Sequence, residues 1–105
     1  MRVVLTTTAT VGDVAALART LVEERLAACA SLLPGLHSLY RWQGAVEEAE
    51  ETLLLLKTSA ENTEALEARL HALHPYETPE FLVLDQISAS APYLNWLLDS
   101  LRAAD

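Results

Sequence analysis

The chain has 105 residues, 51% of them hydrophobic, and a formal net charge of −8 at pH 7. This length and hydrophobic content exclude a wholly disordered chain and suit one folded domain, which we place at residues 1–105. The acidic charge, with no basic stripe to reverse it locally, predicts that the chain does not bind nucleic acid.

Cysteine content and hydropathy indicate the cellular compartment. Cys29 is the only cysteine, so the chain cannot form an internal disulfide. The first residues do not read as a signal peptide, and the longest apolar run, Leu53–Leu56, is far too short to cross a bilayer. We therefore expect a cytoplasmic protein with no membrane contact.

The first predicted elements are a strand and a helix. Residues 3–8 are rich in β-branched side chains and predict a strand. Thr10 and Asp13 stand three residues apart, in a variant of the capping box, and predict the start of a helix. The helix itself is predicted by apolar residues that recur at helical spacing: Val14, Leu17, Ala18, Leu21, Val22 and Leu26.

The second strand is predicted in two parts, over residues 28–33 and 36–42, with Pro34 and Gly35 between them. Proline lacks the N–H that a strand ladder uses. We therefore expect a bend or a bulge where the two parts meet.

A long hairpin follows from the next residues. Gln43 and Gly44 predict a turn, and residues 45–58 predict a third strand. The four consecutive leucines of this strand favour a central position with both faces covered. The strands of this hairpin are longer than ordinary strands. They carry Tyr40 and Trp42, whose aromatic surface a single copy of the chain cannot cover. We expect the hairpin to pair with a neighbouring subunit.

The second half of the chain repeats the pattern of the first. Apolar residues 66, 70 and 73 predict a second helix, which ends before Pro75, and residues 81–84 predict a fourth strand. A last short helix, with Pro92 near its first turn, is predicted by Leu94, Leu97, Leu98 and Leu101. The order β-α-β-β-α-β-α predicts an α+β protein, a ferredoxin-like split β-α-β sandwich with a C-terminal helix.

Five segments together resemble the CutA divalent-cation (copper) tolerance family. They are LVEERLAAC (21–29), PGLHSLYRWQG (34–44), ETLLLLKT (51–58), HPYETPE (74–80) and YLNWL (93–97). They extend over nearly the whole chain in the order and spacing of that family.

The resemblance implies a ferredoxin-like subunit in a homotrimer of PII-like architecture, whose sheets associate through the long hairpin. It also implies a cytoplasmic, non-enzymatic protein that responds to copper and other heavy metals through weak metal binding or signalling. One alternative is a PII-like sensor that binds a small polar or anionic ligand in clefts between subunits, and another is a stable trimeric structural adaptor with no ligand of its own. Triad, Cys-x-x-Cys and P-loop patterns are absent from the sequence, in agreement with a non-enzyme.

The metal site implied by the resemblance is incomplete. The proposed copper site of the family combines a cysteine on the first strand with two adjacent histidines, but Thr6 and Leu73 stand at two of these positions and only His74 is kept. We expect His74 to be a weak ligand for Cu²⁺ or another divalent cation, with no cofactor required. His71, about one helical turn earlier, is a second candidate. The alternative is that His71 is a surface residue and His74 caps the helix.

Cys29 is a lesser metal candidate. It stands among small and apolar residues and has no basic neighbour in sequence that would favour its thiolate. We therefore interpret it as an inert thiol in the core.

The densest acidic run comprises Glu47, Glu48, Glu50 and Glu51. Clustered carboxylates can hold hard cations, but side chains of an extended strand alternate between faces and cannot all converge. We interpret the run as a solvated edge that discourages aggregation.

A ligand cleft is suggested by five residues at positions that the family shares: Tyr40, Trp42, Lys57, Tyr76 and Glu77. A lysine, a carboxylate and aromatic rings suit a small polar or anionic ligand. The alternative is that Lys57 forms an ion pair with a glutamate and locks subunits together.

Overall fold

The computed structural model describes residues 1–9 and 11–103, and of residues 11 and 12 only the backbone. The elements, in chain order, are β1 (Arg2–Thr8), α1 (Val11–Glu23), β2 (Cys29–Trp42), β3 (Ala45–Thr58), α2 (Thr63–Leu73), β4 (Leu82–Leu84) and α3 (Ala91–Ser100). The predicted order of strands and helices is confirmed. Thr10, predicted to help cap α1, lies outside the described residues.

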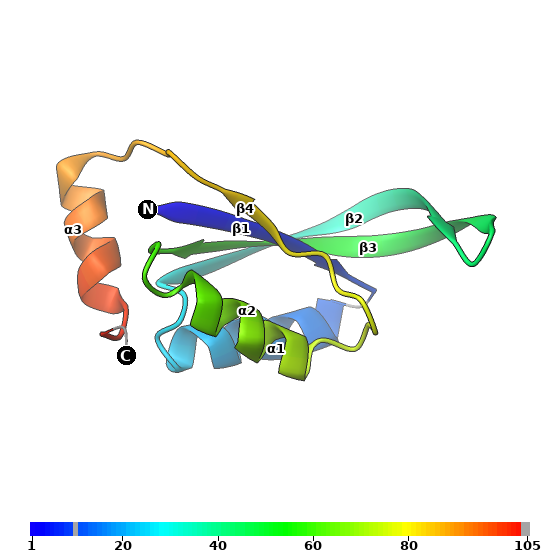
Figure 1. Ribbon diagram of the computed structural model, residues 1–105, viewed down its shortest axis with the longest axis horizontal. Helices are drawn as coiled ribbons and strands as arrows, with labels where there is room; N and C mark the ends of the chain where they lie inside the picture. Colours follow the sequence, from blue (N-terminus) through cyan, green and yellow to red (C-terminus); the bar gives the residue numbers. More distant parts are fainter. Residues whose placement is uncertain (10, 104–105) are drawn as a thin grey trace.

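One antiparallel sheet of four strands, in the order β2-β3-β1-β4, forms the centre of the protein. Helices α1 and α2 lie side by side against one face of this sheet, whereas α3 stands at the end where the N-terminus lies (Figure 1). This arrangement confirms the predicted α+β fold and the central position of β3. No helix in the described part of the chain is long and apolar enough to cross a membrane.

The main core lies between the sheet and helices α1 and α2. It confirms the predicted apolar stripe of α1, because residues 14, 17, 18, 21 and 26 are all buried and Val22 packs against them. The largest side chains that are almost completely buried are those of Val4, Val14, Leu21, Leu26, Leu54, Leu56, Leu66 and Leu70. A smaller cluster of Ala28, Leu97 and Leu101 fixes α3 to the end of the sheet.

Some leucines of the predicted apolar stripes face outwards instead. Leu73 at the end of α2 is 37% exposed, and Leu98 of α3 is 48% exposed. In β3, Leu54 and Leu56 are buried under the helices, but Leu53 and Leu55 are only half-buried on the other face. The prediction that both faces of β3 are covered is therefore wrong for the single chain, because the helices cover one face only.

The hairpin of β2 and β3 projects well beyond α1 and α2 (Figure 1). Each strand has 14 residues, and the chain measures 45 × 25 × 23 Å. The turn is confirmed at Gln43 and Gly44, which both have positive φ angles, 49° and 82°. Positive φ at both central residues is typical of the type I′ turn, whose twist matches that of the paired strands.

Two buried strand threonines differ only in whether the hydroxyl is hydrogen-bonded. Thr6 and Thr58 are both 0% exposed. The Thr58 hydroxyl donates to the carbonyl of Leu26 at 2.8 Å, whereas the Thr6 hydroxyl has no partner among the described residues. A buried polar group without a partner destabilises the folded state.

We therefore expect Thr6→Val to raise the free energy of unfolding by about 1 kcal/mol, and Thr58→Val to lower it by about 1–2 kcal/mol. Urea unfolding of both variants at one protein concentration measures the difference. Equal changes in the two variants would contradict this interpretation of the hydroxyls.

An ion pair on the surface joins α2 to the turn that directly follows α1. The Arg69 guanidinium donates to both carboxylate oxygens of Glu24, with Nε 2.9 Å from Oε1 and Nη2 2.8 Å from Oε2. These hydrogen bonds hold the pKa of Glu24 below its ordinary value of 4.5. The stabilisation is complete above that ordinary pKa and is lost as the pH falls through the lowered one.

We expect Arg69→Met to lower thermal stability at pH 7 and to have a smaller effect as the pH falls below 4.5, the ordinary pKa of Glu24. The matched control is Arg19→Met, which removes an exposed pair with Glu23 at 3.3 Å and should change little at either pH. Melting temperatures measured from pH 7 to pH 3 test the prediction. A loss for Arg69→Met that does not depend on pH would contradict it.

Candidate functional site

A cleft of about 770 Å³ lies along one face of the β2–β3 hairpin, where the hairpin meets the loop after α2. Thr7 closes it from the end of β1, and Glu51 and Leu53 come from β3. The remaining lining residues are Leu36, Ser38, Tyr40 and Trp42 of β2 and Tyr76, Glu77, Thr78, Pro79 and Glu80 of the loop. Volumes of about 300–1,000 Å³ are typical of sites for small molecules.

The predicted bulge decides which side chains of β2 face the cleft. Leu33 pairs with Leu53 and Leu36 pairs with Glu51, so Pro34 and Gly35 together oppose one residue of β3. Gly35 has φ of 85°, a conformation that residues with a Cβ rarely adopt. Because of the extra residue, the even-numbered residues from 36 to 42 share a face with Leu33, whereas in a regular strand they would lie on the opposite face. The bulge therefore places Tyr40 and Trp42 in the cleft.

His74 fixes the loop that forms the other wall. Its Nδ1 accepts the backbone N–H of Tyr76 at 3.0 Å, so Nε2 carries the proton and donates to the carbonyl of Thr7 at 2.9 Å. The His74 ring also meets the Tyr76 ring edge-on, with centroids 4.8 Å apart. The backbone N–H of His74 caps α2 by donating to Leu70 at 2.8 Å. His74 thus ends the helix and attaches the loop to β1.

A tyrosine–carboxylate pair bridges the two walls. The Tyr76 hydroxyl donates to Oε2 of Glu51 at 2.8 Å. Burial of the Tyr76 hydroxyl is the main cause that raises its pKa above the ordinary value of 10, and the adjacent Glu51 carboxylate is the second cause. The Tyr76 hydroxyl therefore remains a hydrogen-bond donor at neutral pH.

The charged side chains that line the cleft are all acidic. Glu51, Glu77 and Glu80 contribute carboxylates, and the described lining residues include no Lys, Arg or His. Glu80 accepts a hydrogen bond from the Thr7 hydroxyl at 3.1 Å. The cleft is thus acidic and aromatic within one chain.

The structure brings together four of the five residues predicted for the cleft: Tyr40, Trp42, Tyr76 and Glu77. Lys57 lies elsewhere, at the far end of β3, where it donates to the Ser31 hydroxyl at 3.2 Å. Within the described chain it forms no ion pair with a glutamate. Sequence reasoning missed Thr7, which lies at the end of a strand without any pattern that marks a site.

The prediction that Glu51 belongs to a solvated edge is wrong. Glu47, Glu48 and Glu50 are exposed as predicted, but Glu51 is only 8% exposed. Glu51 shares a face of β3 with Leu53, and the Tyr76 hydroxyl of the loop donates a hydrogen bond to its carboxylate. The alternation of residues along β3 was the available signal, because it separates Glu51 from Glu50.

The prediction that Cys29 lies in the core is also wrong. Cys29 is only half-buried, and the ammonium of Lys57 lies 3.7 Å from its sulfur. The two residues are 28 positions apart in sequence but pair directly across β2 and β3. The basic neighbour that the sequence lacks locally is thus provided by the adjacent strand.

The candidate metal ligands are dispersed. No group of three or more His, Cys, Asp or Glu side chains suited to a metal occurs among the described residues. His71 is exposed, and its ring lies 6.4 Å from that of Phe81. Both ring nitrogens of His74 are hydrogen-bonded, so a metal ion at His74 would have to displace one of these bonds.

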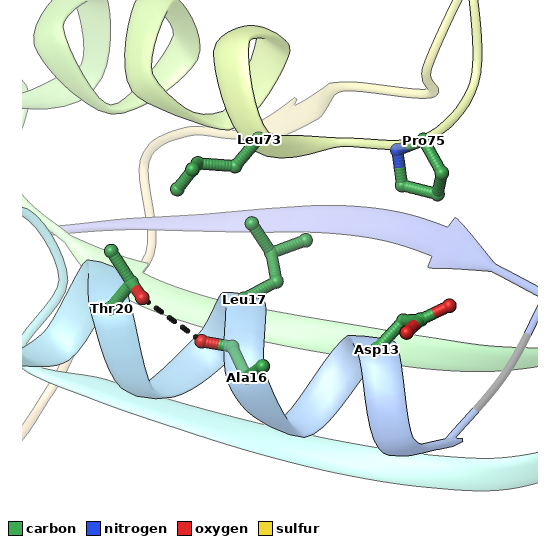
Figure 2. Close-up of a pocket in the computed structure, with 6 residues that line it drawn as sticks. All are labelled: Asp13, Ala16, Leu17, Thr20, Leu73 and Pro75. Carbon is green, nitrogen blue, oxygen red and sulfur yellow. Dashed lines mark hydrogen bonds between the residues drawn. The ribbon is translucent and has the colours of Figure 1, made fainter.

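Thr6 and Leu73, which stand at two positions where the resemblance implies metal ligands, lie in enclosed or apolar surroundings. Thr6 is completely buried. Leu73 points towards α1 across a groove of about 380 Å³, in which Leu17 faces it and Pro75 forms one end (Figure 2). Thr20 donates its hydroxyl to the Ala16 carbonyl at 3.1 Å on the same helix. The groove thus provides packing surface beside α2.

Comparisons with known proteins agree with the fold and the sequence pattern. Residues 2–100 match the family described as CutA1 divalent ion tolerance protein. The divalent-cation tolerance protein CutA of Thermus thermophilus is 49% identical over 84 residues, which cover 80% of this chain and 82% of that protein. CutA of Pectobacterium atrosepticum is 48% identical over 86 residues, covering 82% of this chain and 78% of that protein.

Solved structures of CutA proteins also superpose closely on this chain. The structure of the Thermus thermophilus protein superposes with a TM-score of 0.92 at 45% identity, covering 97% of this chain and 100% of that one. CutA1 of Pyrococcus horikoshii gives 0.93 at 33% identity, covering 98% and 100%. CutA of Synechococcus elongatus gives 0.91 at 44% identity, covering 96% and 89%. The chain belongs to the CutA1 family of divalent ion tolerance proteins.

Proposed function

We propose that this CutA1-family chain acts in the cytoplasm as a homotrimer, without catalysis, in the tolerance of copper and other divalent cations. The action is weak metal binding or signalling. Membership of the family supports the tolerance role. The uncovered apolar surface of the single chain supports the assembly.

The observation that best supports a homotrimer is the exposure of the edge strand β4. Leu82, Val83 and Leu84 are 49%, 40% and 46% exposed, so this strand is apolar on both faces and covered on neither. Further large apolar side chains are exposed on β2 and α3: Leu33, Leu39, Tyr40, Trp42, Tyr93, Trp96 and Leu98. An apolar edge strand that is left open promotes association, and a closed trimer protects it.

The geometry supports weak rather than tight metal binding. Copper is bound tightly by several thiolate or imidazole ligands, whereas His74 provides one imidazole with both nitrogens occupied. A metal ion that replaces the Tyr76 N–H at Nδ1 would free the loop from its anchor. Such a change would couple weak metal binding to the shape of the cleft, which is a route to signalling.

Calorimetric titration of the assembled protein with Cu²⁺ and Zn²⁺ at pH 7 tests this function. We expect dissociation constants of about 1 µM or weaker, lost in His74→Gln and kept in the control His71→Gln. Submicromolar affinity that survives His74→Gln would contradict a site at His74. Heats equal to dilution would leave signalling without direct metal binding.

A second function, that of a PII-like sensor of small molecules, is favoured by the cleft itself. Its volume, aromatic rings and convergent polar groups suit a small polar ligand. An anionic ligand fits the single chain poorly, because the lining has three carboxylates and no basic residue among those described. It would need a basic side chain from a neighbouring subunit.

A further inference from the structure

We propose that the cleft binds a small organic cation, a primary amine or a guanidinium compound. This proposal rests on the sensing function above and names the class of ligand for it. Three features of the described residues support it: a buried carboxylate without a cation, the separation of the carboxylates, and the aromatic rings of β2.

The buried carboxylate is that of Glu51. It lines the cleft, is 8% exposed, and receives a hydrogen bond from the neutral Tyr76 hydroxyl. It forms no ion pair with any basic side chain in the described part of the chain. A carboxylate removed from water is costly unless a positive charge is nearby, so the site is suited to a cation that enters the cleft.

The arrangement of the carboxylates favours an extended cation over a metal ion. Glu51 lies on β3, whereas Glu77 and Glu80 lie on the loop, and Glu80 is turned towards Thr7. These three residues do not form a group suited to a metal ion among the described residues. Carboxylates on separate walls instead suit a molecule with several N–H donors or a charged head and an apolar tail.

The aromatic rings provide the second half of the site. Tyr40 and Trp42 lie on the cleft face of β2 and are 45% and 44% exposed. Ammonium and guanidinium groups are attracted to the faces of such rings, Trp most strongly. Leu36, Leu53 and Pro79 add apolar surface for the body of the ligand. Carboxylates and aromatic rings in one cleft attract cations and repel anions.

The test compares three probes of similar size and different charge, n-butylammonium, butyramide and butyrate, added to the assembled ¹⁵N-labelled protein at pH 7. We expect only butylammonium to shift the backbone amide signals of residues 76–80 in a saturable manner, and the shift to weaken as ionic strength rises. Glu51→Gln, which can still accept from Tyr76, and Glu77→Gln should each weaken binding roughly tenfold. The control Glu67→Gln, on the exposed side of α2, should leave binding unchanged.

Each of the other outcomes would overturn the cation proposal in a different way. Butyrate or butyramide binding as well as butylammonium would overturn the cation proposal and leave the sensing function standing. No saturable shift with any of the three probes would overturn both. An equal loss of binding in Glu67→Gln would show that general surface charge, not the cleft, attracts the amine.

Discussion

The double variant Leu82→Glu/Leu84→Glu is expected to reduce the proposed trimer to single chains. Both side chains lie on the face of β4 that pairs with Leu5 and Val3 of β1 and is not covered by α1 or α2. In a trimer this face would be buried, and two unpaired charges placed there would lose their hydration without compensation. We expect the dissociation constant of the assembly to rise at least about a hundredfold. Light scattering after size exclusion at micromolar concentration measures it.

The control for this variant is Leu73→Glu. Leu73 is also partly exposed, but it faces the groove beside α1, on the helical side of the sheet. It should therefore leave the assembly intact. Far-UV circular dichroism distinguishes loss of assembly from loss of fold in the double variant. A double variant that stays trimeric would place the interface away from β4.

Trp42→Ala is expected to weaken the assembly through the hairpin. Trp42 is 44% exposed in the single chain and stands next to the turn, at the projecting end of β2. If a neighbouring subunit packs against part of the exposed ring, its removal costs roughly 2–4 kcal/mol of association free energy. Sedimentation equilibrium over a dilution series measures this loss.

Trp42→Phe is the matched control, since it keeps an aromatic ring and most of the apolar area. It should cost much less than the alanine variant. Unchanged association in Trp42→Ala would show that no neighbouring subunit packs against this ring.

The parts of the fold that depend on local chemistry could be predicted from the sequence. The stripe of α1 follows from helical spacing alone, and Pro75 ends α2 because the residue before a proline avoids helical geometry. Pro34 and Gly35 predicted the bulge, and Gln43 and Gly44 predicted the turn. In each case one or two residues restrict the backbone wherever they occur.

The site could be predicted only in part, because its geometry depends on pairing between distant residues. Tyr40 and Trp42 face the cleft because the bulge shifts the register between β2 and β3. Lys57 was expected in the cleft but lies beside Cys29, its partner across the strands. The burial of Glu51 depends on Tyr76, which is 25 residues away and is held in place by His74. Apart from the alternation along β3 that separates Glu51 from Glu50, composition and periodicity carry no information on these contacts.

His74 links the two proposed functions. The same imidazole is the family-type metal candidate and the anchor of the loop that carries Tyr76 and Glu77. A change at His74 would therefore alter both metal binding and the cleft. This is why the titration uses His71→Gln as its control, and why the amine test changes carboxylates rather than the histidine.

Sedimentation equilibrium of the unmodified protein at micromolar concentration tests the central claim most directly. The account predicts a single species of three times the 11.5 kDa chain mass, because the β4 edge and the hairpin aromatics of one chain need partners. A stable monomer at that concentration would contradict the account, because the apolar strand β4 would then stay exposed to solvent in the native protein.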